Sequence, residues 1–494
     1  MPPKKKAVTT KTTTSTKKGC TIKTTKSSKT SKTPVKKTSI AGKGKTIELP
    51  DYIDAIKDAN VKELLKSYAK GVSVDKTRTI ENFKNGKTAA STIGHHTSAL
   101  WLAKWSKILT EKTLKEIIDK FSDSHTRLVH SVPPVVEYKH DTKMLNMNLH
   151  WGQRKLMLTE IEFLGFVRDL AKLDKTDTHD FVVVYIGSAD GRHLIPMIDQ
   201  VFPKVFSEFH LYDIPKRYST PVQIATKKGT RSGAKIKIAP YEPTEEGTVT
   251  GFFTDSVCEN YTKKEYKDRV VFISDIRVNT DNESVLNDHL SQDRWIRAIK
   301  PYASMVKFRY PFAMEKGEIM PKYPHLSGAM FLQCYPPPCS NEVRLWTLHP
   351  KFLGLKLFPM HNGDTHLHEN QMNVFNNVLR MATYKNNGGC ACYDCSTEID
   401  IVRRVTNTDL SDERITRWIT RMCATSDSRD KMLEHSYARI RQVIGHIAQY
   451  VKKCDYRNLP SISTWRKKMI SMGSTFNDPP PRIENFLNLP CSSD

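Results

Sequence analysis

Apolar and polar residues alternate with two different periods along this chain of 494 residues. In residues 49–131, large apolar side chains recur every three or four positions, which is typical of amphipathic helices. In residues 132–460, short β-branched and aromatic runs alternate with helical stretches, as in a buried parallel sheet. The pattern therefore predicts a helical extension followed by an α/β domain, with residues 131–134 (SVPP) as the linker between them.

The first predicted strand leads into a glycine-rich turn. Residues 181–186 (FVVVYI) are too few to span a membrane and are typical of a buried parallel strand. Gly187 and Gly191 follow, and they allow a tight strand-to-helix turn with close approach of a ligand to the backbone. Taken alone, this turn is equally compatible with an NAD site or with a tight turn that binds nothing.

Two further predicted strands end in an acidic residue. Residues 209–212 precede Asp213, and residues 270–274 precede Asp275. Asp213 lies 22 residues beyond Gly191, close to the interval of roughly 20 residues at which an acid binds a ribose diol in such folds. Because open α/β sheets bind ligands at the carboxyl ends of their strands, both acids and the glycine turn are predicted to border one site.

Four ionisable residues stand in apolar or strand-like settings, within the segments GQRKLMLT, VVFISDIR, MVKFRYPF and NEVRL. They are Lys155, Asp275, Lys307 and Glu342. Gathered in one pocket, two amines and two acids would withdraw the proton of a weakly acidic hydroxyl, as ribose methylation requires. Taken singly, these residues have simpler explanations. Lys155 could be a solvated residue of a predicted helix at 152–173, Asp275 a cap after a strand, and Glu342 a same-face strand partner of Arg344.

In this order and approximate spacing, the segments resemble the poxvirus-type cap-specific mRNA 2′-O-methyltransferase family, whose members also act as processivity subunits of the viral poly(A) polymerase. The resemblance runs from about residue 138 to about residue 380. It implies a methyltransferase-type α/β sheet with helices on both faces and S-adenosylmethionine as the methyl donor. It further implies methylation of the ribose next to the 7-methylguanosine cap, with capped mRNA and the polymerase catalytic subunit as partners.

The resemblance also implies roles for individual residues. Lys307 would be the general base and Lys155 its cationic neighbour, because burial and a second ammonium both disfavour a charged amine. Asp275 and Glu342 would orient these amines. The implied donor-binding positions are Gln153, Tyr185, Gly187, Gly191 and Asp213. The chain departs from the family pattern at Asp190, where proline is usual, and at Pro215, near a usual arginine.

A cap pocket is implied by the same comparison. The positions expected to contact the cap or the RNA are Tyr138, Arg309, Phe312, Glu315 and Glu369. Tyr138 and Phe312 would sandwich the cationic 7-methylguanine, which gains cation–π energy that a neutral base lacks. Glu369 would accept a hydrogen bond from the guanine edge. The family's cap pocket has a second acid, and Glu315 is displaced by one residue from its position. Alternatively, Phe312 belongs to the core and Glu369 is the exposed start of a helix predicted at 370–384.

The charge is strongly basic and unevenly spread. The formal net charge is +24, and residues 1–45 hold 14 lysines and no acid. We expect residues 1–48 to form a disordered basic tail, because this stretch has too few apolar residues to offset its conformational entropy. Such a tail could tether polyanions, act as a nuclear signal or simply aid solubility. Residues 461–494 are predicted to form a C-terminal tail, after a helix at 430–453.

Cysteine usage favours an intracellular, reduced protein. The chain has ten cysteines, no cationic and apolar leader and no apolar run of 18 residues, so we expect neither secretion nor a membrane span. The resemblance places the protein in the virion and the host cytoplasm. Cys390, Cys392 and Cys395 are clustered, but no fourth ligand is evident and no metal is assigned.

Two other functions remain open. An RNA-binding processivity subunit would need a basic surface but no donor site. A structural nucleic-acid packaging protein would need only the basic tail. The presence of all four ionisable residues and both turn glycines favours the enzyme.

Overall fold

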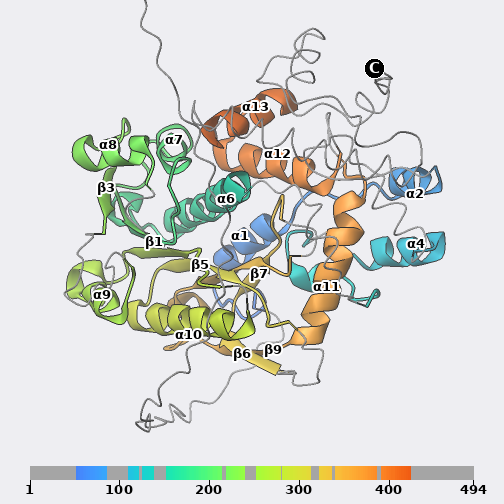
Figure 1. The fold of residues 1–494 in the computed structure, drawn as a ribbon, viewed down its shortest axis with the longest axis horizontal. Coiled ribbons are helices and arrows are strands. Elements are labelled where there is room, and N and C mark those ends of the chain that lie inside the picture. The colour runs from blue at the N-terminus through green and yellow to red at the C-terminus, as the bar shows by residue number, and fades with distance from the viewer. Residues whose placement is uncertain are drawn as a thin grey trace, which may run out of the picture. The chain divides into compact units, whose positions relative to one another are not determined.

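A seven-stranded mixed sheet is the centre of the computed structural model, with strand order β3-β2-β1-β4-β5-β8-β7 (Figure 1). Its strands are β1 Val182–Ile186, β2 Glu208–Tyr212, β3 Lys235–Ile238, β4 Val270–Ser274, β5 Ala303–Phe308, β7 Ala329–Phe331 and β8 Val343–Leu348. Strands β3, β2, β1, β4 and β5 are mutually parallel, whereas β8 is antiparallel to both of its neighbours. This is the α/β sheet that the sequence pattern predicts, of the methyltransferase type that the family resemblance implies.

The structure describes ten stretches of the chain, which all belong to one unit of residues 46–494. They are residues 52–85, 109–121, 125–137, 152–213, 218–239, 252–279, 281–312, 322–336, 340–385 and 391–423. The predicted terminal tails and the helix predicted at 430–453 lie outside the described residues. The domain limits therefore stay predictions.

The three predicted strands are confirmed as β1, β2 and β4. All residues of β1 and β4 are buried, because helices cover both faces of the sheet (Figure 1). This is why their sequences, VVVYI and VVFIS, are continuously apolar rather than alternating.

The predicted helix at 152–173 is confirmed as α6 Gly152–Leu173, and it packs with other helices over one face of the sheet. Its neighbours on that side are α1 Ala59–Ala69, α7 Leu194–Gln200, α12 Tyr393–Thr406 and α13 Asp412–Cys423. The opposite face is covered by α10 Asn282–Ile299, which contacts α9 Asp255–Asn260. The other described α-helices are α2 Lys76–Lys84, α4 Glu111–Lys120, α8 Thr220–Lys228 and α11 Thr365–Asn377. None of the described helices has the length and apolarity that a membrane crossing requires.

Buried ion pairs fix α6 to its surroundings. Arg154 binds Glu398 of α12 through two hydrogen bonds of 2.5 Å. Arg127 binds Glu162 through bonds of 3.0 and 2.6 Å. Because an unpaired buried charge is costly, these pairs leave α6 little freedom to shift or rotate.

A second, two-stranded sheet pairs β6 Lys322–Leu326 with β9 Met360–Asp364, which leads directly into α11. The expected linker, residues 131–134, packs against α11. Val132 is 1% exposed, and its carbonyl accepts a hydrogen bond from Gln371 of that helix. The helix expected at 370–384 instead begins at Thr365 and ends at Asn377. A short 3-10 helix follows it at Leu379–Met381.

Candidate active site

Four predicted residues meet on one face of the sheet because successive strand residues point to opposite faces. In β4 and β5, alternate residues such as Ile273 and Met305 pack toward α6. Continuing that alternation by two positions places Asp275 and Lys307 on the same face, at the carboxyl ends of the strands. Glu342, just before β8, falls on this face by the same rule.

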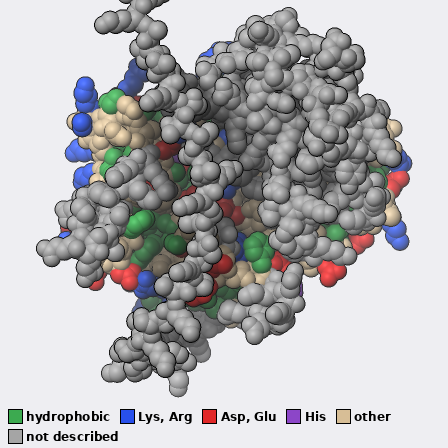
Figure 2. Space-filling view, in the orientation of Figure 1, with side chains coloured by type: hydrophobic (Ala, Val, Ile, Leu, Met, Phe, Trp, Pro, Cys, Tyr) green, Lys and Arg blue, Asp and Glu red, His purple; other side chains and the backbone are tan. Residues whose placement is uncertain are grey.

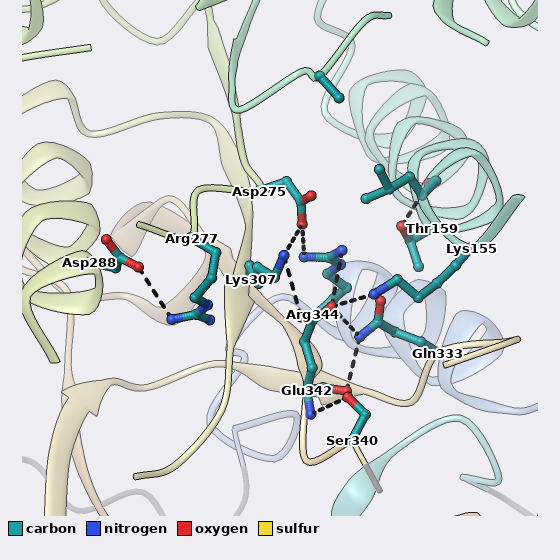
Figure 3. Close-up of polar contacts among 12 residues, drawn as sticks. Lys155, Thr159, Asp275, Arg277, Asp288, Lys307, Gln333, Ser340, Glu342 and Arg344 are labelled. Carbon is teal, nitrogen blue, oxygen red and sulfur yellow. Dashed lines mark hydrogen bonds and ion pairs between the residues drawn. The ribbon is translucent and has the colours of Figure 1, made fainter. Parts of the chain in front are cut away.

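The charged groups are in direct contact (Figure 3). The Lys155 amine, from the first turn of α6, lies 2.6 Å from Glu342. The Lys307 amine lies 3.3 Å from Asp275 and 3.4 Å from Glu342. Gln333 donates to the Glu342 backbone carbonyl at 2.9 Å. The four side chains are only 11–15% exposed, so they form a shielded cluster that is still open to a small group.

Arg344 is a fifth member of the cluster that the sequence reasoning treated only as a structural partner. It pairs directly with Lys307 across the β5–β8 register and is 2% exposed. Its guanidinium lies 2.7 Å from Asp275 and 3.5 Å from Glu342. The two-residue spacing from Glu342 to Arg344 was the available signal, because it puts both side chains on one strand face.

Burial and mutual attraction set the charges of the cluster. Burial lowers the pKa of Lys155, as do Arg344 and Lys307, although Glu342 opposes them. Burial alone would raise the pKa of Glu342 and of Asp275, but the neighbouring cations lower both below their ordinary values. Both acids are therefore ionised at neutral pH, and the Lys155 amine loses its proton more readily than a free lysine.

The glycine turn lies against the same cluster. Gly187 has φ +74°, and a Cβ there would lie 2.9 Å from the backbone carbonyl carbon of Asp275. Gly191 also has a positive φ, +61°. The Asp213 carboxylate accepts a hydrogen bond from the Ala189 backbone within the turn at 2.7 Å. The glycine turn, Asp213 and Asp275 thus share one rim of the sheet.

Tyr185, one of the expected donor-binding residues, is buried, and its hydroxyl is bonded to another side chain. It is 1% exposed, and its hydroxyl donates to Glu160 of α6 at 2.5 Å. His193 contacts the same carboxylate at 2.8 Å. Burial, followed by the charges of Glu160 and Asp275, raises the Tyr185 pKa well above its ordinary value. Sequence reasoning missed Glu160 and His193, because neither stands in a recognisable motif.

Gln153 lies in the first turn of α6, two residues before Lys155, but its side chain lies outside the described residues. Tyr138 and Glu315, two of the expected cap contacts, also lie outside the described residues. The expected stacking of Tyr138 on the cap and the role of Glu315 as the second acid therefore stay predictions.

Three expected cap contacts are described. The Arg309 guanidinium carbon lies 4.2 Å from the centre of the Phe312 ring. Phe312 is half-buried, and Asn282 of α10 binds its backbone on both sides. Glu369 is 3% exposed and lies within α11, so the alternative of an exposed helix start is wrong.

The cysteine cluster is only partly described. Cys392 is buried at the start of α12 and Cys395 is half-buried, whereas Cys390 lies outside the described residues. Among the described residues, no group of three or more His, Cys, Asp or Glu side chains is arranged to hold a metal ion. A cavity of about 360 Å³ lies beside β7, and its lining includes His130, His325, His361 and His368. None of the five residues of the charged cluster lines it.

Known proteins match about half of this chain. The family described as "Poly A polymerase regulatory subunit" matches residues 128–405. The cap-specific mRNA (nucleoside-2′-O-)-methyltransferase of fowlpox virus (strain NVSL) is 28% identical over 239 residues, or 46% of this chain and 68% of that protein. The protein of the same name from myxoma virus (strain Lausanne) is 27% identical over 237 residues, or 47% of this chain and 62% of that protein. The myxoma alignment thus spans less than two thirds of the relative.

A more distant likeness exists to a solved structure of bluetongue virus VP4, described as a multifunctional RNA-capping production line. Its TM-score is 0.29 and its identity 12%, over 51% of this chain and 36% of that one. The fold assignment rests instead on the strand order of the sheet. Since the family match covers more than half of the sequence, the chain belongs to the poly(A) polymerase regulatory subunit family.

Proposed function

We propose that this protein transfers a methyl group from S-adenosylmethionine to the 2′-hydroxyl of the nucleotide next to the 7-methylguanosine cap of mRNA. The observation that carries the proposal is the position of Asp275. Its backbone packs against the Gly187 turn, and its carboxylate lies 3.3 Å from the Lys307 amine. A donor held at the turn would therefore bring its reactive end close to an amine that can accept a proton.

The residues of the rim fit such a donor. The Gly187 turn leaves no room for a side chain because its backbone packs against that of Asp275, which holds the turn beside the end of β4, where the donor would bind. Asp213, which accepts from the Ala189 backbone, would also accept from the ribose diol of the donor. S-Adenosylmethionine would supply an electrophilic methyl group on a sulfonium. The names of the viral relatives support this chemistry.

The charge balance of the cluster supports proton removal. Lys155, Lys307 and Arg344 face only two carboxylates, so a fully protonated cluster carries one surplus positive charge. Loss of one amine proton balances the charges. In the proposed step, the ribose hydroxyl passes its proton to the unprotonated Lys307 nitrogen as its oxygen bonds to the methyl carbon; the bond from that carbon to the sulfonium sulfur breaks, and the donor leaves as a neutral thioether. The two acids hold the Lys307 amine in position, at 3.3 Å from Asp275 and 3.4 Å from Glu342.

The test uses the full chain with short capped and uncapped RNA and labelled donor, followed by digestion to nucleosides. We expect label in a 2′-O-methyl nucleoside only with capped RNA. Lys307→Ala should lower the rate by about 10²- to 10⁴-fold, the usual contribution of a general base, while leaving donor binding intact. Lys267→Ala, at an exposed lysine, is the matched control and should behave as wild type.

Label on a base, or equal labelling of uncapped RNA, would exclude the proposed reaction. Near-normal transfer by Lys307→Ala would remove that residue from its role but leave the reaction standing. The two outcomes are therefore separable within one assay.

A second role, as an RNA-binding processivity subunit of a viral poly(A) polymerase, is favoured by the family match and by a basic surface. Lys and Arg side chains gather over α8 and β3 (Figure 2). The exposed members are Lys227, Lys228, Arg231, Lys235 and Lys237. This surface would attract RNA phosphates in a salt-dependent manner. The two roles are compatible, because the basic surface and the charged cluster use different residues. A location in the virion and host cytoplasm stays a prediction.

A further inference from the structure

Arg309 stacks on the very ring that is proposed to bind the cap. It follows β5, two residues after Lys307, and is 6% exposed. Its guanidinium carbon lies 4.2 Å above the centre of the Phe312 ring. This is the distance and arrangement of a cation–π contact, which is the interaction expected for a cationic 7-methylguanine on the same ring.

Asn282, the first residue of α10, holds both partners of this stack. Its side-chain oxygen accepts from the Phe312 backbone at 2.8 Å and from the Arg309 guanidinium at 3.3 Å. Its side-chain nitrogen donates to the Phe312 carbonyl at 2.9 Å. Arg309 also donates to the Tyr310 carbonyl at 3.0 Å. These contacts define one conformation in which the cation lies on the ring.

The stacked group remains a cation at neutral pH. Burial, followed by repulsion from Arg277, lowers the pKa of Arg309 to about 10. This value is still well above neutrality, so the guanidinium stays protonated. Its partial burial strengthens the electrostatic attraction to the ring relative to a contact in open water.

We propose that Arg309 is an internal competitor of the cap's cationic base and thereby sets the affinity of the cap pocket. The inference rests on the proposed function and on the expected stacking of Phe312 on 7-methylguanine. If the base takes the ring face that Arg309 covers, the guanidinium must leave first. If the base takes the other face, the charge of Arg309 acts through the ring against a second cation. Both arrangements weaken cap binding.

The usual expectation for an arginine in an RNA-binding site has the opposite sign. An arginine that contacts phosphate or base contributes attraction, so its removal weakens binding. An arginine that occupies or opposes the aromatic ring weakens binding, so its removal strengthens it. The direction of the change therefore decides between the two roles.

The experiment measures the affinity of the full chain for the dinucleotide cap analogues m7GpppG and GpppG by isothermal titration calorimetry. We expect Arg309→Gln, which keeps a polar group for Asn282, to bind m7GpppG about 2- to 30-fold more tightly, the range that one cation–π contact spans. Arg309→Lys keeps the charge but loses the planar stack, and should give a smaller gain. Arg294→Gln, at an exposed arginine of α10, controls for net charge.

Introducing Phe312→Leu into both backgrounds completes the test. The gain from Arg309→Gln should disappear without the ring, because the competition acts through Phe312. Unchanged or weaker binding by Arg309→Gln overturns the proposal, as does a gain that persists in the leucine background. Should Arg309→Gln fail to fold, Arg309→Lys decides, and an unchanged affinity in that variant is the refuting result.

The same titrations separate this inference from the proposed function. A wild-type protein that binds both analogues equally would contradict the cap pocket itself. A wild-type preference for m7GpppG, combined with weaker binding by Arg309→Gln, would refute only the competitor role.

Discussion

Replacing Arg344 by methionine should damage the charged cluster more than any surface substitution. The guanidinium lies 2.7 Å from Asp275 and 3.5 Å from Glu342, and the side chain is 2% exposed. Methionine fills a similar volume but carries no charge. Asp275 would then keep Lys307, at 3.3 Å, as its nearest cation among the described residues.

The magnitude follows from the burial of the pair. At an effective dielectric constant of roughly 20, unit charges about 4 Å apart attract by about 4 kcal/mol. Removal of one partner from a buried pair typically costs about 3–5 kcal/mol when the remaining charge is left without a counter-ion. Because Lys307 stays 3.3 Å from Asp275, we expect the loss of the Arg344 contacts to lower the free energy of unfolding by less, about 1.5–3 kcal/mol.

Methyl transfer should also fall, for a related reason. Without Arg344, the Lys155 amine loses one of the charges that lower its pKa, and the cluster no longer gains charge balance by losing a proton. One pH unit in a rate profile corresponds to about 1.4 kcal/mol. We expect a loss of at least about tenfold at pH 7 and a rate–pH profile moved to higher pH.

Urea unfolding and single-turnover methyl transfer between pH 6 and 10 measure both effects. Arg294→Met is the matched control, since it removes an arginine from an exposed pair with Asp255 and should cost no more than about 1 kcal/mol. The reasoning fails if Arg344→Met unfolds like the control and keeps the wild-type pH profile.

Two further predictions concern the donor turn and the acids. Gly187→Ala should raise the donor KM and destabilise the fold by at least about 1–2 kcal/mol, because φ is +74° and the Cβ would lie 2.9 Å from the Asp275 backbone. Gly233→Ala has φ +92° but no heavy atom within 4 Å of its Cβ, so in thermal unfolding and donor titration it should show only the backbone cost. The depressed pKa values of Asp275 and Glu342 mean that their stabilisation is full above the unfolded values of about 4 and is lost as the pH falls through the folded ones. Urea unfolding between pH 7 and 2 should therefore show a steeper acid loss for wild type than for the Asp275→Asn/Glu342→Gln variant, and equal slopes would contradict this.

The elements that the sequence predicted well are those with strong local patterns. The runs in β1 and β4 are continuously apolar because both faces are covered, and α6 carries a long helical period. The pair β6–β9 had no such signal. β6 contains Pro324, and β9 has the sequence MHNGD, so neither resembles a strand until the other is beside it.

The site shows the same division between local and tertiary information. The four predicted ionisable residues meet because strand alternation and the shared rim fix their direction. The contacts of Glu160 and Arg309 depend on neighbours that are distant in sequence or on loop geometry, and no periodicity encodes them. Tyr185 illustrates the limit, because its position in β1 was predicted but the partner of its hydroxyl was not.

The placement of the Lys155 amine depends on residues that never touch the reacting groups. Arg154, its neighbour in sequence, is fixed to α12 by Glu398. Glu160, further along the same helix, is fixed to β1 by Tyr185 and to the start of α7 by His193. Buried charges of this kind seldom add net stability compared with apolar packing of the same volume. Their presence on both sides of Lys155 is instead explained by orientation, because they fix the rotation and height of α6 at two points and so hold the amine 2.6 Å from Glu342.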